Sequence, residues 1–321
     1  MDASKYKRRA WLEVDLDALD RNVRKCRQII GDKCALTAVV KSNAYGLGAE
    51  VIARELVKAA ECGLRVHAKL DTGFHRLGFD CRAEKLPEIA RILGMKGLKL
   101  EGVYSHLALV NHDEDMKQFA LFDAAVEYLR AHGISPRYAH IDDSIGMVRY
   151  PEHQRDMVRV GAFLYGVWPS RYDDPITKEP VIATLKARVT HLSHLGIGEG
   201  AGYDFLFRAE RPSTLATICA GYGDGYARAA SKYNGEVSIR ASRCKLAGLA
   251  CMDQMMADVT DVKGVSVGDE VTLFGGREVP IMEYADWSDT NRNEAISRVT
   301  ARVPRLYMRG GEVVEVLDYM E

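Results

Sequence analysis

The sequence predicts an α/β domain followed by a separate, mostly β domain. Three observations support this. Strand-like and helical patterns alternate from residue 36 to residue 166, polar side chains able to do chemistry stand at the strand ends, and short β-rich runs dominate after about Pro180. Strands that alternate with helices are typical of parallel βα units. The predicted domains span residues 16–178 and 179–321, and residues 1–15 are expected to pack on the second.

Length and composition agree with a two-domain globular chain. It has 321 residues, 47% of them hydrophobic and 28% charged, with a formal net charge of −1. This balance offers no basic surface for nucleic acid, and no apolar run is long enough for a membrane span. The basic N-terminus lacks a following apolar core, so no signal peptide is predicted. The 7 cysteines form no CxxC pair, which indicates neither a zinc site nor disulfides and favours a reducing cytoplasm.

Apolar spacing locates the individual elements. Residues 10–15 alternate like a strand, and residues 16–30 have helical spacing. The predicted strands of the βα units are 36–40, 64–70, 98–104, 137–141 and 157–165. The predicted helices are 50–61, 83–93 and 113–131. In the second domain, strands are expected at 187–195, 214–219, 236–239, 245–250 and 268–274.

The first strand of the alternating half ends in Lys41, and a polar, glycine-punctuated turn follows it. In (β/α) barrels, catalytic groups stand at the carboxyl ends of the strands. A lysine that is partly removed from water can lose its proton more easily and attack an aldehyde. Most lysines are simply solvated, so the assignment depends on the other motifs of the chain.

The stretch Val39-Val40-Lys41-Ser42-Asn43-Ala44-Tyr45-Gly46 resembles the pyridoxal-phosphate (PLP) lysine motif of bacterial alanine racemases. Five further stretches resemble the family's other signatures and occur in family order: residues 69–79, 158–166, 221–226, 251–254 and 302–307. Six signatures in order are far more specific than any one alone. The resemblance implies a PLP-binding (β/α) TIM-type barrel followed by a mostly β C-terminal domain.

The resemblance also implies the site residues. Lys41 would bind PLP through its amine and act as one catalytic base, and Tyr222 would be the second, since racemisation needs a base on each face of the substrate. The cofactor would contact Lys41, Tyr45, Arg76, His106, Ser144, Arg159, Gly161 and Ala162. The substrate would contact Arg76, Met252, Asp253 and Asn293. No metal is predicted, because a strand-end histidine with loop carboxylates, as at residues 140–143, is more often structural.

In this resemblance Arg159 would face the pyridine nitrogen of PLP. Because arginine only donates hydrogen bonds, it would keep that nitrogen unprotonated and weaken the ring as an electron sink. Ser144, Gly161 and Ala162 follow the last two strands of the predicted domain, where barrels often bind phosphate. Asp143 replaces the usual asparagine of the family, next to this phosphate. Lys69 matches a lysine that is carbamylated in many members.

Asn293 stands where alanine racemases usually have a tyrosine, counting back from Arg302. Asparagine is smaller and both donates and accepts hydrogen bonds, so it would admit the hydroxymethyl group of serine. This resembles the serine racemases of vancomycin-resistance systems, whose catalytic domain follows a membrane domain. The chain would then be cytoplasmic or the soluble domain of a membrane-anchored parent. Neutral drift at a pocket edge is the alternative.

The expected function is therefore PLP-dependent racemisation of serine, alanine or both, which supplies D-amino acids for peptidoglycan precursors. The resemblance implies a homodimer with shared active sites, in which Tyr222, Met252 and Asp253 reach into the partner's site. The alternatives are a plain alanine racemase, another PLP-barrel protein such as a decarboxylase, and a truncated remnant without activity.

The predicted barrel is too short. Several βα units separate the lysine strand from the next one in the family, whereas here the strand at residues 64–70 follows Cys62 almost directly. Roughly three units are missing at the junction Cys62-Gly63-Leu64 if a complete barrel has eight. An internal deletion, an artificial or misassembled sequence, and a segment omitted when the residues were numbered would all explain it. A five-strand remnant would expose two strand edges.

Overall fold

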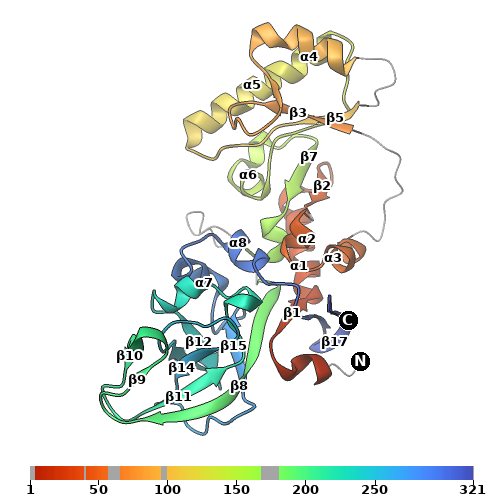
Figure 1. Cartoon of the computed structure of the whole chain (residues 1–321). Helices are drawn as coiled ribbons and strands as arrows, with labels where there is room; N and C mark the ends of the chain where they lie inside the picture. Colours follow the sequence, from red (N-terminus) through yellow and green to blue (C-terminus); the bar gives the residue numbers. More distant parts are fainter. Residues whose placement is uncertain (1–3, 40, 57–65, 95–99, 168–180, 321) are drawn as a thin grey trace. The chain divides into compact units, whose positions relative to one another are not determined.

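A computed structural model describes residues 4–39, 41–56, 66–94, 100–167 and 181–320 (Figure 1). It divides into two compact units. We call the first the α/β unit; it holds Val23–Val39 and Val57–Leu164. We call the second the β unit; it holds Met1–Asn22, Val40–Leu56 and Tyr165–Glu321. The expected domain boundary at residues 178 and 179 and the junction Cys62-Gly63-Leu64 both lie outside the described residues, so these two expectations stay predictions.

The α/β unit is built on short parallel strands. They are β2 (Ala35–Ala38), β3 (Val66–Asp71), β4 (Phe79–Asp80), β5 (Leu100–Tyr104), β6 (Tyr138–His140) and β7 (Met157–Val160). β4, β3, β5 and β6 are neighbours in that order, and β2 pairs in parallel with β7. β7 lies beside β6, because the Arg159 amide donates to the Asp142 carbonyl over 3.0 Å. The order β3–β5–β6–β7–β2 is the succession expected of neighbouring strands in a barrel wall.

Helices cover one side of these strands, as α4 and α5 show in Figure 1. The helices are α4 (Leu86–Leu93), α5 (His112–Ala131) and α6 (Ser144–Arg149). α5 begins at the cap Asn111, whose side chain accepts from the Glu114 amide, and it has three acidic residues in its first turn. Its apolar face packs with α4 and the strands into one core, which includes Leu70, Ile89, Val103, Phe122 and Leu129.

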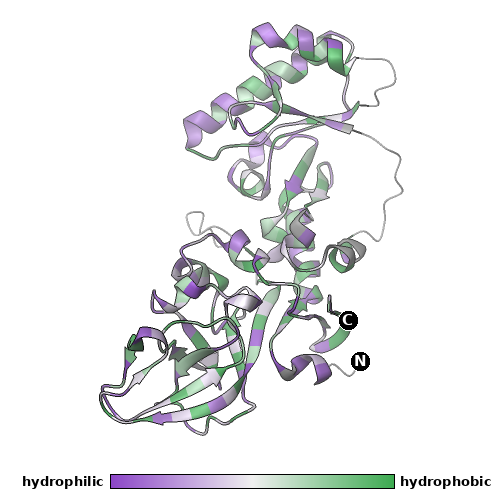
Figure 2. Cartoon of the chain, in the orientation of Figure 1, coloured by the Kyte–Doolittle hydropathy of each residue, from purple (hydrophilic) through white to green (hydrophobic). Residues whose placement is uncertain are grey.

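The β unit is organised around a large sheet with the strand order β13-β12-β15-β8-β1-β16-β17. β11 also pairs with β8, and β14 pairs with β11. The bounds are β1 (Trp11–Asp15), β8 (Ala183–Leu195), β9 (Gly200–Ala201), β10 (Phe207–Arg208), β11 (Ser213–Ile218), β12 (Glu236–Ile239), β13 (Ser242–Lys245), β14 (Met255–Asp258), β15 (Glu270–Phe274), β16 (Arg305–Arg309) and β17 (Glu312–Leu317). Buried and half-buried residues alternate along the first part of β8, and Figure 2 shows the matching bands of hydropathy. β1 pairs in parallel with β16 and antiparallel with β8, so the N-terminal strand lies inside this sheet.

The helices of the β unit are short: α2 (Lys41–Tyr45), α3 (Ala49–Leu56), α7 (Ile281–Trp287) and α8 (Arg292–Ser297). The helix α1 (Leu16–Ile30) has residues in both units. The sequence analysis did not predict α7 and α8. The signal for α8 was present, because its cap Asn291 accepts from the amide of Glu294, an Asn-x-x-Glu spacing typical of helix starts.

Most predicted elements differ from the structure by a few residues at one or both ends, and the largest differences concern two strands. The strand expected at 157–165 ends at Val160, because the Ser144 hydroxyl accepts from the amides of Gly161 and Phe163 and a 3₁₀ turn (Ala162–Tyr165) follows. The strand expected at 245–250 lies at Ser242–Lys245, where it forms a hairpin with β12. The helix expected at 50–61 is described from Ala49 to Leu56, and the rest of it lies outside the described residues.

Candidate active site

The predicted site residues fall in both units, and each set is described by itself. In the α/β unit, Arg159 on β7 is the centre of a polar cluster at the carboxyl ends of β5 and β6. Its NH2 group donates to the carbonyls of Ser105 and Ile141, at 2.7 and 3.0 Å. Its NH1 group donates to Nδ1 of His140 at 2.8 Å. The guanidinium also lies over the Tyr104 ring, 5.2 Å from the centroid. Burial lowers the pKa of Arg159, but an arginine keeps its proton in proteins.

Two histidines extend this cluster, and the donor-only chemistry of arginine defines their tautomers. His140 Nδ1 must accept from Arg159, so the proton of the neutral ring is on Nε2. That Nε2 lies 2.9 Å from Nδ1 of His67, which therefore accepts in turn. Burial, followed by the charge of Arg159, lowers the pKa of His140 to about 3. The chain Arg159–His140–His67 thus carries a single positive charge at neutral pH.

His67 and His140 come from β3 and β6, which are separated by β5. Their rings meet across the middle strand because residue 102 on β5 is glycine. A Cβ at Gly102 would lie 2.5 Å from His67 Nδ1, which is inside contact distance. Sequence reasoning left both histidines out of the site. The available signal was a glycine in a strand, which often marks the close approach of other groups.

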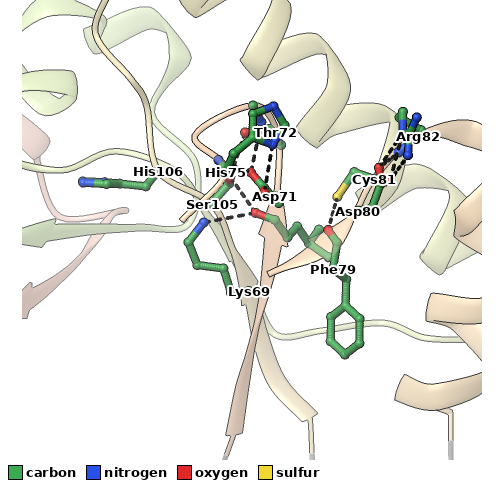
Figure 3. A network of polar contacts seen from close by, with 12 residues as sticks. Lys69, Asp71, Thr72, His75, Phe79, Asp80, Cys81, Arg82, Ser105 and His106 are labelled. Carbon is green, nitrogen blue, oxygen red and sulfur yellow. Dashed lines mark hydrogen bonds and ion pairs between the residues drawn. The ribbon is translucent and has the colours of Figure 1, made fainter. Parts of the chain in front are cut away.

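Figure 3 shows a second part of the cluster, at the ends of β3 and β5. Thr72 and Ser105 share a hydrogen bond of 2.7 Å, and Ser105 also donates to the Leu70 carbonyl. The amine of Lys69 is nearly buried and donates to the same carbonyl at 3.3 Å. Burial is the main cause of the lowered pKa of Lys69, and the charges of Arg159 and Arg76 act in the same direction. A lowered pKa favours the neutral amine, which is the form of lysine that reacts with carbon dioxide.

His106 and Arg76 are brought together by Phe74. The His106 ring lies 5.2 Å from the Phe74 ring, and the Arg76 guanidinium lies 4.5 Å from the centroid of that ring. His106 Nδ1 is also 3.5 Å from Arg159 NH2. Burial, against the opposing effect of Asp143, lowers the pKa of His106 to about 4. Arg76 itself is exposed, so its charge is available to a bound anion.

Ser144 and Gly161 are also adjacent, as the sequence predicted for a phosphate site. Ser144 is the first residue of α6, and its hydroxyl accepts from the Gly161 amide at 3.1 Å. Ala162 is the next residue, at the start of the 3₁₀ turn. Asp143, which the sequence analysis left unexplained, is the cap of α6, since its carboxylate accepts from the amides of Ile145 and Gly146. Aspartate and asparagine cap helices about equally well, so this role accounts for the exchange.

In the β unit, Lys41 is the first residue of α2, and its side chain is outside the description. The backbone of this loop is unusual, because Asn43, Ala44 and Tyr45 all lie in the left-handed region, with φ of 55°, 53° and 59°. The half-buried ring of Tyr45 lies 4.9 Å from that of Tyr165. α2 packs against α8, which carries the exposed Asn293 as its second residue.

Tyr222 begins a short 3₁₀ turn (Tyr222–Asp224) and is 40% exposed. Its backbone is joined to the Cys251–Met252 segment, because the Tyr222 amide donates to the Cys251 carbonyl at 3.1 Å and the Gly223 amide to the Met252 carbonyl at 2.8 Å. The turn therefore presents Tyr222 next to Met252, which is 54% exposed, and Asp253. The structure thus brings together these three residues, which the sequence predicted to act together.

Asp224 holds this turn in place. Its fully buried carboxylate accepts from both Arg9 and Arg302, at 2.7 Å from Arg9 NH2 and 2.9 Å from Arg302 Nε. It also accepts from the Gly221 amide at 2.9 Å. Arg302 NH1 pairs with Asp253 at 2.8 Å. Sequence reasoning noted Asp224 and Arg302 only as parts of motifs and assigned them no role, whereas it expected Asp253 at the substrate.

Comparisons with known proteins support the same pairing of domains. The family described as alanine racemase, N-terminal domain, matches residues 14–64 and 53–169, and the family described as alanine racemase, C-terminal domain, matches residues 182–307. An alanine racemase of Desulforamulus reducens is 30% identical over 366 residues, which cover 93% of this chain and 98% of that protein. Alanine racemase 1 of Clostridium acetobutylicum is 33% identical and covers 83% of this chain and 70% of that protein.

Solved structures show the same fold. The alanine racemase of Bacillus anthracis with bound L-Ala-P has a TM-score of 0.85 at 27% identity, and the match covers 98% of each chain. The alanine racemase of Clostridium difficile has a TM-score of 0.91 at 24% identity. Fold and domain matches together define a two-domain, PLP-dependent isomerase. The chain belongs to the alanine racemase family.

The comparisons also bear on the shortened first domain. The alignment with the Desulforamulus reducens protein spans 366 positions, whereas this chain has 321 residues, so the relative has residues without a counterpart here. The N-terminal family match comes in two pieces, which overlap at residues 53–64, around the junction where the sequence predicts missing βα units. Within the described part of the chain, no helix is both long and apolar enough to cross a membrane.

Proposed function

We propose that the chain is a racemase of alanine and serine that uses Lys41 and Tyr222 as its two bases. The observation that carries this proposal is the Tyr222 turn. Its phenol is exposed, while Asp224 beneath it is fully buried between two arginines. A rigid turn that presents one ionisable group to a ligand fits a positioned proton carrier. Cytoplasmic location and a role in supplying D-amino acids for peptidoglycan belong to the same proposal.

The donor groups of this chain fit PLP. A phosphate needs hydrogen-bond donors, and Ser144, Tyr45 and the amides of Gly161 and Ala162 offer them. A pyridine nitrogen needs one donor, and Arg159 is a cation whose other partners are carbonyls and a neutral imidazole. Arg76 and His106 would complete the cofactor contacts. When bound, PLP withdraws electrons from the Cα of an amino acid and so makes its proton acidic.

The residues of the chain would then divide the work. Lys41 would hold the cofactor through its amine and move a proton on one face of the substrate, and Tyr222 would do so on the other. Arg76 would bind the substrate carboxylate, together with the Met252–Asp253 segment. Arg159, which cannot give up its proton, would restrain the electron-withdrawing power of the ring and so limit side reactions.

The proposed racemase is a homodimer in which Tyr222, Met252 and Asp253 serve the partner's site. The exposure of Tyr222 and Met252 supports this arrangement, since an exposed catalytic phenol needs a second surface to exclude water. The test mixes two inactive variants, Lys41→Ala and Tyr222→Phe. In a mixed dimer one site receives both defects and the other receives neither, so random mixing should restore about a quarter of wild-type activity.

Each variant alone should lose at least about a hundredfold in kcat, since it removes one of the two proton carriers. Tyr233→Phe is the matched control, because Tyr233 is an exposed tyrosine of the same unit without a proposed role. Mixing that restores nothing would contradict the shared site, and full activity of Tyr222→Phe would contradict the two-base proposal.

Serine is proposed as a substrate because of Asn293. It is exposed on α8, which packs against the helix that begins with Lys41. Its amide could hold a hydroxyl that a tyrosine would exclude. Asn293→Tyr should lower the ratio of kcat/KM for serine over alanine by about tenfold or more, the range for a small steric change in a pocket. An unchanged ratio would favour neutral drift at this position and a plain alanine racemase.

A specific observation favours a second candidate, a remnant without activity. Among the described residues, β2 pairs with β7 alone, and the outer side of β3 carries only the two-residue β4. Such a wall leaves strand edges open. Absence of PLP absorbance from the purified chain after incubation with the cofactor would support the remnant, whereas a borohydride-fixed adduct on Lys41 would exclude it.

A further inference from the structure

The loop at residues 41–48 needs support from outside, and its backbone shows why. Three successive residues, Asn43, Ala44 and Tyr45, have left-handed φ angles. This conformation crowds Cβ against the following carbonyl and is unfavourable for every residue with a side chain. Local bonds, such as the one from the Gly48 amide to the Asn43 carbonyl at 3.0 Å, close the turn but do not remove this crowding.

The support comes from β16 of the same unit. Arg305 is only 2% exposed, and its Nε donates to the Gly46 carbonyl at 3.1 Å. Its other bonds go to the carbonyls of Val299, Thr300 and Val303, at the C-terminal side of α8. Two residues further along β16, the Tyr307 hydroxyl donates to the Leu47 carbonyl at 2.6 Å. Residue 48 is a glycine for the same reason, since a Cβ there would lie 2.1 Å from that hydroxyl.

The same segment also holds the Tyr222 turn. Arg302 donates through Nε to Asp224 at 2.9 Å and pairs through NH1 with Asp253 at 2.8 Å. Its NH2 donates to the Met252 carbonyl at 3.3 Å. One guanidinium therefore ties the turn that carries Tyr222 to the neighbouring Met252–Asp253 segment. Arg302 and Arg305 are separated by only two residues, Val303 and Pro304.

We propose that residues 302–307 form a clamp that sets the positions of both acid–base loops. In this clamp Arg302 positions Tyr222, while Arg305 and Tyr307 position Lys41. The inference rests on the proposed roles of Lys41 and Tyr222. The three clamp residues are positioning residues, because they contact loop carbonyls and carboxylates and leave the proton transfers to the loops. With Tyr222 serving the partner's site, each clamp supports elements of two active centres.

The clamp predicts separable local effects. Tyr307→Phe removes only the hydroxyl that holds Leu47, and Arg302→Gln removes the ion pairs of the Tyr222 turn and the bond to the Met252 carbonyl. Amide hydrogen exchange of the holoenzyme should therefore speed up about tenfold in residues 43–48 for Tyr307→Phe and in residues 221–226 for Arg302→Gln, because the first change loses one hydrogen bond and the second loses three polar contacts. Arg305→Met would remove the bonds to four carbonyls and is expected to unfold the chain, so it is not the decisive variant.

The chain offers matched controls. Arg309 lies on the same strand and pairs with Asp17, Asp20 and Glu55, away from both loops, so Arg309→Gln controls for the loss of a β16 arginine. Tyr150 is buried and donates to Asp115 at 2.6 Å in the other unit, so Tyr150→Phe controls for the loss of a buried hydroxyl. Neither control should change exchange in residues 43–48 or 221–226.

Kinetics supply the second readout. With alanine deuterated at Cα, Tyr307→Phe should raise the primary isotope effect in one direction of racemisation, and Arg302→Gln should raise it in the opposite direction. A uniform rise in exchange over the whole chain, or equal isotope effects in both directions, would overturn the clamp and leave these residues as general stabilisers. A chain without racemase activity would overturn the proposed function instead, while hydrogen exchange would still decide whether the clamp exists.

Discussion

Two arginine sites, one in each unit, are held by opposite means. In the α/β unit, the partners of Arg159 are neutral, and its shortest bonds go to the Ser105 and Ile141 carbonyls and the imidazole of His140. In the β unit, Arg9 and Arg302 converge on the buried carboxylate of Asp224. An arginine among neutral acceptors keeps its full charge, whereas an arginine on a carboxylate is neutralised. The partners of an arginine thus indicate whether its charge is already neutralised; they do not exclude a supporting role, since Arg305 donates only to carbonyls and holds a loop.

The largest effect on the free energy of unfolding should come from removing Arg159 from its neutral partners. Arg159→Gln leaves the Ser105 and Ile141 carbonyls and His140 Nδ1 without their charged donor, and we expect a loss of about 3 kcal/mol in the free energy of unfolding. Chemical denaturation measures it. Arg137→Gln is the control in the same unit, since its side chain is 65% exposed and its ion pair with Glu101 should be worth less than about 1 kcal/mol. Equal losses in both variants would contradict the comparison.

Asp142 provides a second test of how the α/β unit buries charged groups. It is fully buried beside this cluster, and neither carboxylate oxygen has a hydrogen-bond partner among the described residues. Burial, followed by the charge of Asp143, raises its pKa from 3.8 to about 7. The folded chain therefore binds an extra proton between these two pH values, and stability falls as the pH rises through that window.

Asp142→Asn should remove this dependence. When the pH rises from 5 to 8, the wild type should lose about 2–3 kcal/mol in the free energy of unfolding, because about two pH units of this interval lie below the pKa of Asp142 in the folded chain. The variant should not show this loss, so its stability relative to the wild type should rise by the same amount. Denaturation at the two pH values measures the change. A stability difference that stays constant with pH would show that Asp142 is not protonated in the folded chain.

His140 should have the opposite dependence. Its pKa is lowered from 6.5 to about 3, so the unfolded chain binds the extra proton between these values. Its contribution is complete above pH 6.5 and is lost as the pH falls. We expect about 2 kcal/mol of lost stability at pH 5, and His140→Asn should remove that slope while it lowers stability at every pH. A variant that keeps the full slope would place the titration on another residue.

Sequence reasoning located most of the scaffold but little of the support around the site. The strands of the α/β unit other than the two-residue β4, and the β-rich character of the β unit, followed from apolar periodicity, which records burial directly. The His67–His140 contact did not, because it depends on two strands that meet across Gly102. The bonds from Arg305 and Tyr307 to the Lys41 loop join residues more than 250 positions apart. Such long-range contacts leave no local pattern.

Asp143 illustrates the same limit and leads to the smallest predicted effect. From the sequence alone, a carboxylate in place of the family's asparagine adds an unexplained charge beside a proposed phosphate site. In the structure its carboxylate caps α6, accepting at 2.9 and 3.0 Å from two amides. Because asparagine caps as well as aspartate, Asp143→Asn should change stability by less than about 0.5 kcal/mol, whereas Asp143→Ala should cost about 1 kcal/mol.

The phosphate gives this last pair of variants a second use. If Asp143 serves as a cap alone, Asp143→Asn should leave the affinity for PLP unchanged, since its carboxylate is already engaged by the helix amides. If its charge opposes the phosphate, the variant should bind PLP more tightly, by up to about tenfold for a like charge removed near the surface. Titration of the apo chain with PLP separates the two, and an unchanged affinity for PLP is the result that we expect.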